Sequence, residues 1–254
     1  MRVRVLGVSG GEVPGRGLTS FLVDERLALD AGHLTGSLAL DAQCALDAIL
    51  LSHAHLDHVK DVAFLADNLA GRRERPLLVA GVRPVLDAIR AHLLNDVIWP
   101  DFTRLPSADS PVLRLVPLPD GAPATIAGYT VRAVPVDHLA PAVGYLVSRD
   151  GRTLVWAGDT GPTEALWKSV AAERGVGAVI LEVSFPNRMR EIARASGHHT
   201  PATFRAELDK IGHRNVPVYV THVKAGCLEE VAREIAALAL PFVRLLSPGD
   251  VFEV

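Results

Sequence analysis

Four residues that commonly bind metal ions lie within six positions of the sequence: His53, His55, Asp57 and His58. They follow the apolar run AILL (48–51), which predicts a buried strand, and they precede a segment with helical spacing. Imidazole and carboxylate groups suit Zn²⁺, Mn²⁺ or Fe, and four of them exceed what one tetrahedral ion needs. This cluster therefore predicts a centre with two metal ions. The alternative is a solvated polar turn, which a preceding buried strand disfavours.

Three further candidate ligands stand alone in the sequence: His138, Asp159 and His222. Each lies where an apolar run ends, after YTVRAVPVD, within TLVWAGD and within VPVYVTH respectively. Residues at strand ends can converge on one site. A single residue of this kind is more often a surface or core residue, but the three together complete the ligand set that the first cluster requires.

The elements that must position these residues are β-strands and amphipathic helices in a mixed order. Helical spacing appears in the segments 62–69, 85–93, 200–211 and 231–235. Apolar runs predict strands at 3–8, 20–23, 26–32, 48–51, 77–80, 112–116, 129–136, 143–147, 153–158, 178–183, 216–223 and 242–246. Two sheets sandwiched between helices would suit this order. No repeat or linker marks a boundary, so we expect one domain over 1–254.

Composition bounds the function. The 254 residues are 49% hydrophobic and 22% charged, which is enough to bury a core. No apolar run approaches the length of a membrane span, no secretory signal is evident, and Cys44 and Cys227 are too few for a disulfide framework. We therefore expect a cytoplasmic protein. The 26 basic and 29 acidic residues give a net charge of −3, which argues against binding to bulk nucleic acid.

The spacing of His53, His55, Asp57 and His58, followed by isolated ligands at strand ends, resembles that of the metallo-β-lactamase superfamily of dinuclear metallohydrolases. The resemblance covers essentially the whole chain and implies an α/β fold, a four-layer αβ/βα sandwich with two mixed sheets flanked by helices. It also implies the ligand assignment: one ion on His53, His55 and His138, the other on Asp57, His58 and His222, and Asp159 bridging both. An aspartate bridge resembles the branch that acts on phosphodiesters and thioesters more than the lactam-cleaving branch.

Further segments resemble class II cyclic-nucleotide phosphodiesterases. They are LLNDVIWPDF (93–102), AGDTGPTEALW (157–167), LEVSFPNRM (181–189), SGHHTP (196–201) and THVKAG (221–226). The resemblance implies hydrolysis of 3′,5′-cyclic AMP or GMP to nucleoside 5′-monophosphates through a metal-bridging hydroxide. The expected cofactors are two divalent ions per chain, Zn²⁺ with Mn or Fe as alternatives. Where the family usually has Leu, this chain has His199, which leaves the exact pocket open.

The leaving 3′-oxygen of a phosphodiester needs a proton, so a general acid outside the metal ligands is expected. We predict His198 in this role, oriented by Glu182, and we count Asp57 with them among the catalytic residues. The same pair of Glu and His resembles the arrangement in the tRNA 3′-processing nucleases. The alternative for His198 is a neighbour of a helix cap at Thr200.

Several residues keep two interpretations. Lys224 would contact phosphate or be solvated, and Trp99 and Phe102 would stack on a base or belong to the core. The arginines Arg188, Arg190 and Arg194 would be solvated or near phosphate. The remaining histidines without ligand-type neighbours, expected at the surface or in loops, are His33, His92 and His213.

Two rival functions stay open. A tRNA 3′-processing endonuclease, or another phosphodiester hydrolase of the superfamily, would keep every ligand and the pair of Glu182 and His198. It predicts a protruding Gly/Pro- and Lys-rich arm, and the sequence has no such insertion. The other rival, a sensor that binds a cyclic nucleotide without hydrolysing it, would not need both the ligands and the acid. The expected partner is thus a small cyclic nucleotide, with no bulk nucleic acid and no membrane; a homodimer is left open.

Overall fold

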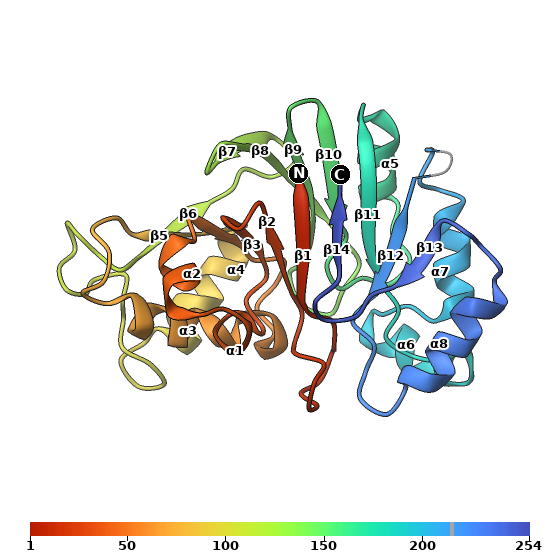
Figure 1. The fold of residues 1–254 in the computed structure, drawn as a ribbon, viewed down its shortest axis with the longest axis horizontal. Helices are drawn as coiled ribbons and strands as arrows, with labels where there is room; N and C mark the ends of the chain where they lie inside the picture. Colours follow the sequence, from red (N-terminus) through yellow and green to blue (C-terminus); the bar gives the residue numbers. More distant parts are fainter. Residues whose placement is uncertain (214–215) are drawn as a thin grey trace.

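Two β-sheets pack face to face in this computed structural model, and helices cover the outer side of each (Figure 1). The structure describes residues 1–213 and 216–254. Each sheet has seven strands and contains both parallel and antiparallel pairs, which makes both sheets mixed. The predicted fold class, an α/β four-layer sandwich, is therefore confirmed.

The first sheet is parallel at one end and antiparallel at the other. In spatial order its strands are β14 (Val251–Glu253), β1 (Arg2–Gly7), β2 (Ser20–Val23), β3 (Leu27–Leu29), β4 (Ala48–Leu50), β5 (Leu77–Gly81) and β6 (Leu113–Pro117). Strands β3 to β6 run parallel to one another, so the residues that follow them meet along one edge of the sheet. The first cluster of predicted metal ligands follows β4 and lies at this edge.

The second sheet has the same organisation. Its strands in spatial order are β13 (Val243–Leu245), β12 (Val218–Thr221), β11 (Val176–Glu182), β10 (Arg152–Trp156), β9 (Val143–Arg149), β8 (Tyr129–Pro135) and β7 (Pro123–Ile126). Strands β10 to β13 are parallel, and β7 to β10 form antiparallel pairs. Asp159 follows β10, and His222 comes directly after β12, so both leave the same edge.

The helices fill the connections between strands. They are α1 (Leu34–Ser37), α2 (Leu40–Ala45), α3 (Leu56–Leu69), α4 (Arg83–Ala88), the π-helical turn η1 (Ile89–Leu93), α5 (Ala165–Ala172), the 3₁₀ turn η2 (Asn187–Met189), α6 (Arg190–Ser196), α7 (Pro201–Leu208) and α8 (Leu228–Ala237). Helix α7 begins with a capping box between Thr200 and Thr203, and Pro201 occupies its first turn. Among the described residues, no helix is both long and apolar enough to cross a membrane.

Alternating side chains divide the core into two parts. On β10, Trp156 faces the space between the sheets, while the adjacent Val155 packs under the outer helices. On β11, Ile180 likewise faces the space between the sheets, and Leu181 packs under the outer helices. Because side chains alternate along a strand, a continuous apolar run indicates a strand buried on both faces. This is why these runs were recognisable in the sequence.

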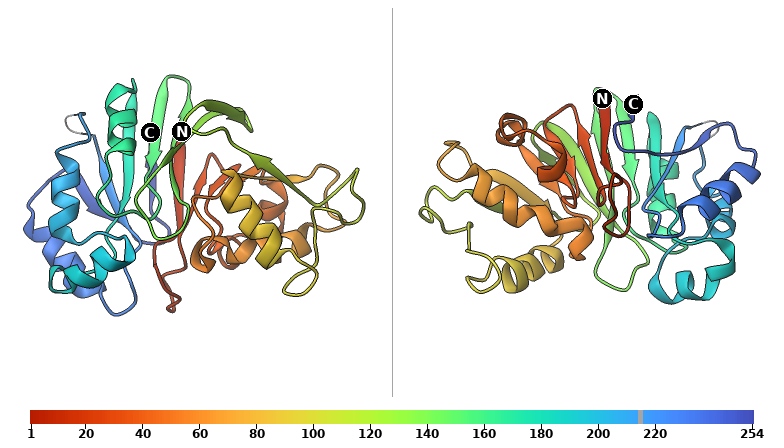
Figure 2. Two further views of the ribbon diagram at one scale, coloured as in Figure 1. Left: turned by 180° about the vertical axis from the view of Figure 1, so that it is seen from behind. Right: turned by 60° about the horizontal axis from the view of Figure 1, so that its bottom comes forward.

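The two ends of the chain meet in the first sheet. Strands β1 and β14 pair antiparallel, and the amino group of Met1 donates a hydrogen bond of 3.1 Å to the carbonyl of Val254. The termini lie side by side in the views of Figure 1 and Figure 2. Both are remote from the edge at which the ligand-bearing loops leave the strands (Figure 1).

Each of the predicted strands has a counterpart, with ends that differ by a few residues. The segment predicted as a strand over 216–223 corresponds to β12, which ends at Thr221 because His222 adopts a left-handed backbone conformation with φ of 63°. Strands β7 and β14 and helices α1, α2, α5 and α6 were not predicted. These elements are three to eight residues long, which leaves little periodicity to detect, and β14 pairs with a strand at the other end of the chain, as Phe252 opposite Val3 illustrates.

Candidate metal centre

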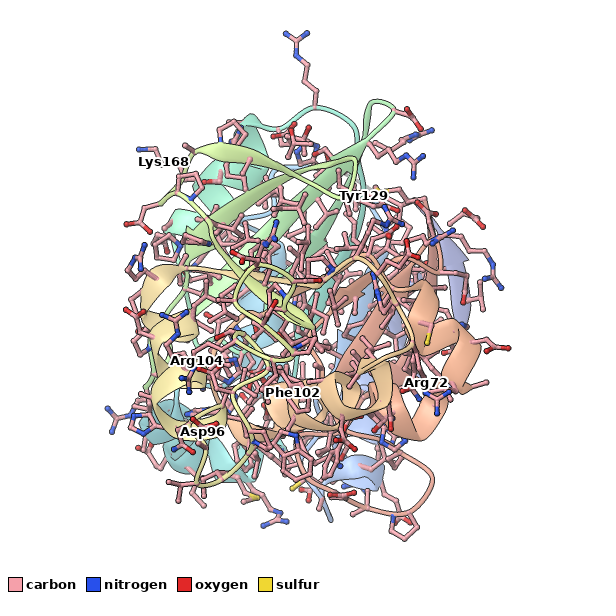
Figure 3. The ribbon with its side chains drawn as sticks, turned by 90° about the vertical axis from the view of Figure 1, so that its left-hand side faces the viewer. Arg72, Asp96, Phe102, Arg104, Tyr129 and Lys168 are labelled. Carbon is pink, nitrogen blue, oxygen red and sulfur yellow. The ribbon has the colours of Figure 1, made fainter. Side chains whose placement is uncertain are left out.

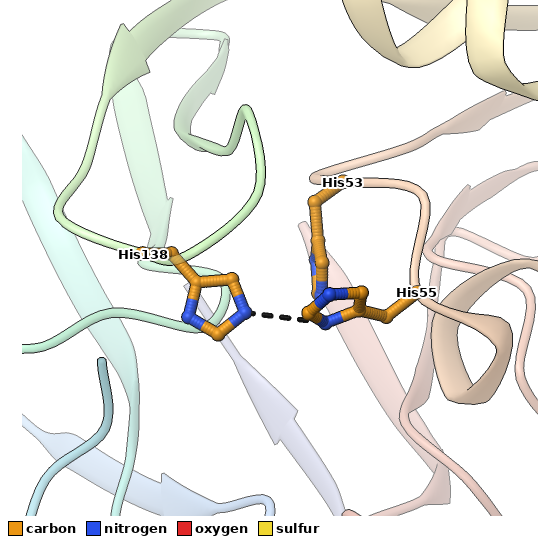
Figure 4. Close-up of side chains that lie close together, drawn as sticks. All are labelled: His53, His55 and His138. Carbon is orange, nitrogen blue, oxygen red and sulfur yellow. Dashed lines mark hydrogen bonds between the residues drawn. The ribbon is translucent and has the colours of Figure 1, made fainter. Parts of the chain in front are cut away.

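The seven predicted ligands converge at the edge of the sandwich where both sheets end their parallel strands. They come from the loop after β4 and the first turn of α3 in the first sheet, and from the ends of β8, β10 and β12 in the second. Figure 4 shows the rings of His53 and His55 on one side and that of His138 on the other, turned toward one another. The structure thus brings together residues that are far apart in sequence. Asp57 and His222, for example, are separated by about two thirds of the chain length.

His53, His55 and His138 form the first group, with ligand atoms within 4.8 Å of one another. Nε2 of His138 lies 3.2 Å from Nδ1 of His55. Two atoms bound at about 2.0–2.1 Å to one tetrahedral ion lie roughly 3.4 Å apart. The spacing of these nitrogens therefore fits ligands of one shared ion.

Asp57, His58 and His222 form the second group. Nε2 of His222 lies 3.2 Å from Nε2 of His58 and 3.3 Å from Oδ2 of Asp57. Two ring nitrogens that face each other gain little from a direct hydrogen bond when both are acceptors. A cation between them would satisfy both.

Asp159 lies between the two groups. Its Oδ1 is 3.3 Å from Nε2 of His58, and its Oδ2 is 3.1 Å from Nε2 of His222 and 3.8 Å from Nε2 of His53. Within the described part of the chain, Nε2 of His53 and Oδ1 of Asp159 are buried without a hydrogen-bond partner. Buried polar atoms without partners are costly. The donor set and these two atoms thus fit a pair of divalent ions with Asp159 between them.

Three of the imidazole rings are held from behind through their Nδ1 atoms. Nδ1 of His58 lies 2.8 Å from the Asp30 carboxylate, and Nδ1 of His222 lies 2.9 Å from Oγ of Ser184. Nδ1 of His138 donates a hydrogen bond of 3.0 Å to the carbonyl of Gly197. These contacts leave Nε2 of each ring directed into the centre.

Asp30 and Ser184 were missed in the sequence. Asp30 immediately follows β3, and it also accepts hydrogen bonds from the backbone and hydroxyl of Ser52, each 2.7 Å long. The criterion that selected Asp159, a carboxylate at the end of an apolar strand, would have selected Asp30 as well. No sequence signal distinguishes Ser184 from an ordinary serine.

The backbone around the centre is in unusual conformations at two residues and leaves no space for a side chain at a third. Asp30 and His222 both have positive φ, 56° and 63°, in the left-handed region. Gly10 lies against the ring of His222, where an added Cβ would come 2.7 Å from Cε1. Strained backbone of this kind is typical of functional sites.

The titratable groups have the charges that metal binding requires. Burial lowers the pKa values of His53, His138 and His222, which keeps these rings neutral. Burial raises the pKa of Asp159, but His222 and His58 lower it more, so it lies well below its usual range. Neutral imidazole and ionised carboxylate are the forms that ligate metal ions.

His58 is the exception among the buried ligands. Burial lowers its pKa, but the carboxylates of Asp159 and Asp30 raise it more, and the result lies well above its usual value. The two carboxylates therefore stabilise positive charge at this point of the centre. A bound cation would supply the same charge.

His198 and Glu182 lie next to the ligands. Nδ1 of His198 is 2.5 Å from Oε1 of Glu182, and the ring stacks on His222 with centroids 5.4 Å apart. Burial lowers the pKa of His198, but Glu182 raises it more, so the pKa lies above the usual value. His198 lies just before the N-cap Thr200, yet its ring points toward Glu182 rather than serving as a cap.

The other residues considered for substrate binding lie at or beyond the border of the predicted ligand cluster. Nζ of Lys224 donates a hydrogen bond of 2.9 Å to the carbonyl of Gly10 and lies 3.7 Å from Asp57. His199 is fully buried, and in the described structure its Nε2 has no partner. The arginines Arg188, Arg190 and Arg194 are exposed. Arg188 pairs with Glu230, and the other two pair with Glu191.

Two aromatic rings and three histidines belong to packing or surface. Phe102 is buried in the core, and Trp99 packs edge-on against Phe64 with centroids 5.3 Å apart. His92 is exposed, and His33 and His213 are half-buried. The structure therefore favours the core interpretation for the two aromatic rings.

Comparison with known proteins identifies the family. The profile of the Beta-lactamase superfamily domain matches residues 29–223. The chain belongs to this superfamily. Its metallo-β-lactamase fold is shared with the protein YhfI of Bacillus subtilis, at 19% identity over 99% of both chains and a TM-score of 0.77. Yeast PDE1 has the same fold, at 18% identity over 98% of both chains and a TM-score of 0.80.

Curated relatives of this metallo-β-lactamase chain include ribonucleases. It is 29% identical over 229 residues to the ribonuclease Z of Mycobacterium sp. (strain KMS), covering 81% of this chain and 75% of the relative. The superfamily predicted from the sequence is confirmed, and with it the assignment as a metal-dependent hydrolase.

The expected partner, a small cyclic nucleotide with no bulk nucleic acid, is wrong in the light of this relationship, because the curated relatives are named as ribonucleases. The net charge of −3 misled the prediction. A sum over the chain does not report how charge is distributed. It also omits divalent ions, each of which would add two positive charges where a phosphodiester must bind.

Proposed function

We propose that this chain is a dinuclear-metal ribonuclease that hydrolyses a phosphodiester bond of precursor tRNA, in the manner indicated by the name of its relatives. The observation that carries the proposal is the pair of Glu182 and His198 set against the ligand cluster. A ligand cluster alone suits many hydrolases, whereas a separate acid suits a substrate whose leaving oxygen is basic. RNA and a 3′,5′-cyclic nucleotide both have such a leaving oxygen, and the names of the curated relatives favour RNA.

The ligand assignment is part of this proposal. His53, His55 and His138 would hold one ion, Asp57, His58 and His222 the other, and Asp159 would lie between them. Two divalent ions bound there would neutralise the charge of a phosphodiester and lower the pKa of a water molecule. Zn²⁺ suits this mixture of nitrogen and carboxylate ligands, and Mn and Fe remain alternatives.

Side chains outside the ligand set would supply the proton for the leaving oxygen. The carboxylate of Glu182 holds Nδ1 of His198, which leaves Nε2 as the ring nitrogen from which a proton can reach the leaving 3′-oxygen. The backbone N–H groups of Thr160 and His199 also donate hydrogen bonds to the carboxylate of Glu182, each with a donor–acceptor distance of 3.3 Å. These bonds keep the carboxylate in place. Asp57 is half-buried on the open side, where His55 is exposed, so substrate reaches the centre from there.

A substrate panel tests this function. Metal-loaded protein is incubated with precursor tRNA, with a short unstructured RNA and with cyclic AMP, and initial rates are compared. The proposal predicts the highest specificity constant for precursor tRNA and no cleavage of it by Asp159→Ala. Turnover of cyclic AMP with precursor tRNA left intact would refute the proposed substrate.

A further inference from the structure

A second site of unusual composition lies at the opposite end of the first sheet. A cavity of about 750 Å³ is lined by the five arginines Arg26, Arg73, Arg75, Arg114 and Arg149. Asp47 is the one acidic residue in its lining. In a chain with a net charge of −3, this concentration of guanidinium groups needs an explanation.

The cavity is separate from the metal centre. Arg26 and Asp47 come directly before β3 and β4, Pro76 directly before β5, and Arg114 is the second residue of β6. These strands are parallel, so their first residues share one edge of the sheet. His53 follows the other end of β4, and the metal ligands therefore lie at the opposite edge.

The positive charge of the cavity is only partly neutralised. Asp47 is shared between Arg26, at 3.8 Å, and Arg75, at 3.9 Å. Arg149 lies 3.5 Å from Asp24 and 3.6 Å from Asp150, two carboxylates outside the lining. Over residues 1–213 and 216–254, no carboxylate lies within 4.0 Å of Arg73 or Arg114. Arg73 is half-buried and Arg114 is exposed. With no carboxylate partner in the described residues, each guanidinium can still donate hydrogen bonds to the oxygens of a bound phosphate or carboxylate.

Contacts from behind hold some of these side chains in place. Arg73 donates hydrogen bonds to the carbonyls of Leu46, at 2.5 Å, and Arg75, at 2.9 Å. The guanidinium of Arg149 lies over the ring of Tyr129, 5.3 Å from its centroid. A preorganised group loses less entropy when a ligand binds.

We propose that this cavity binds a small molecule with two or more phosphate groups. Its volume lies within the range of roughly 300–1,000 Å³ typical of small-molecule sites. The apolar side chains of Pro76, Leu78 and Ala127 complete the lining and would contact a non-phosphate part of the ligand. A concave site of this size favours a compact ligand over the extended backbone of an RNA. The proposal does not depend on the function of the metal centre.

Calorimetric titration of the metal-loaded protein with pyrophosphate, with ATP and with a short single-stranded RNA tests the proposal. Arg114→Glu changes an exposed arginine of the cavity, and Arg72→Glu is the matched control. Arg72 carries the same charge on the same turn as Arg73 but does not line the cavity; Figure 3 labels it together with Tyr129. We expect Arg114→Glu to weaken binding of pyrophosphate or ATP by about tenfold or more. Arg114→Gln should have a smaller effect, and Arg72→Glu should change affinity by less than about twofold.

Polyphosphates also bind metal ions, so each titration is repeated with Asp159→Ala. Binding in the cavity should persist in this variant. The proposal is overturned if neither pyrophosphate nor ATP binds, or if Arg114→Glu and Arg72→Glu have equal effects. It is also overturned if affinity depends on Asp159 rather than Arg114, or if only RNA binding depends on Arg114.

Discussion

Nδ1 of His58 lies 2.8 Å from Oδ2 of Asp30, a carboxylate that is itself completely buried. The same oxygen accepts a hydrogen bond of 3.2 Å from Nε1 of Trp156, in the core between the sheets. One ligand of the proposed metal centre is thus anchored to the centre of the fold. This connection explains why β3, a strand of only three residues, matters to the site.

Asp30→Asn should weaken metal binding on the side of His58, because an amide is a poorer acceptor for the imidazole N–H. Loss of such a supporting contact typically costs about 10- to 100-fold in metal affinity. Metal content is measured by atomic emission after dialysis against a competing chelator. Asp67→Asn, an exposed change on α3, is the control. Equal retention of metal by both variants would contradict the role given to Asp30.

Asp159→Ala should lower the metal content below two ions per chain and reduce RNA cleavage by several orders of magnitude, since it removes the carboxylate between the two groups. Circular dichroism should show that the fold is largely retained. A variant that keeps two ions and full activity would refute the ligand assignment. Replacement of Asp57 or His222 should preferentially remove the ion proposed to bind Asp57, His58 and His222.

His198→Ala should keep both metal ions, because His198 is proposed as a proton donor and not as a ligand. Cleavage of RNA expels a basic ribose oxygen, and loss of the acid should slow it by roughly 10²- to 10⁴-fold. Bis(p-nitrophenyl) phosphate expels a stable phenolate, so the same variant should lose far less activity on it.

Glu182→Gln should show the same dependence on the leaving group in milder form, because Glu182 only orients the ring. Equal losses on both substrates would instead assign His198 to phosphate binding or to the shape of the pocket. No loss on either would show that His198 takes no part in catalysis.

A buried carboxylate outside the metal centre should contribute to the stability of the second half of the fold. Glu207 accepts hydrogen bonds from the indole N–H of Trp167, at 2.5 Å, and from the backbone of Thr163, at 3.1 Å. Glu207→Ala leaves these buried donors unpaired and should lower the free energy of unfolding by about 2–4 kcal/mol.

Glu164→Ala is the matched control for Glu207→Ala. Glu164 is exposed and pairs with Lys210, the lysine that also pairs with Glu207. An exposed ion pair contributes at most about 1 kcal/mol. Urea unfolding at a fixed metal concentration measures both variants. Equal destabilisation by the two substitutions would contradict this account.

The sequence predicted the parts of the structure that depend on local pattern. Long apolar runs gave β10 and β11, because both faces of these strands are buried. The cluster from His53 to His58 was visible because its members lie close together in sequence.

Features that depend on distant contacts could not be predicted in the same way. Ser184 acquires its role only because β11 and β12 pair, which brings it to the ring of His222. The arginine-lined cavity joins residues from the starts of four strands and from the turn after α3. A total charge cannot report such a local concentration, and the prediction about nucleic acid failed for the same reason.

Single-turnover cleavage of a precursor tRNA tests the central claim most directly, with both the rate and the chemistry of the new ends measured. Water attack with departure of the 3′-oxygen predicts one fragment with a 3′-hydroxyl and one with a 5′-phosphate, in wild-type protein and not in Asp159→Ala. Intact RNA, or fragments that end in a 2′,3′-cyclic phosphate, would contradict the account, because the metal centre would then not be the site of phosphodiester hydrolysis.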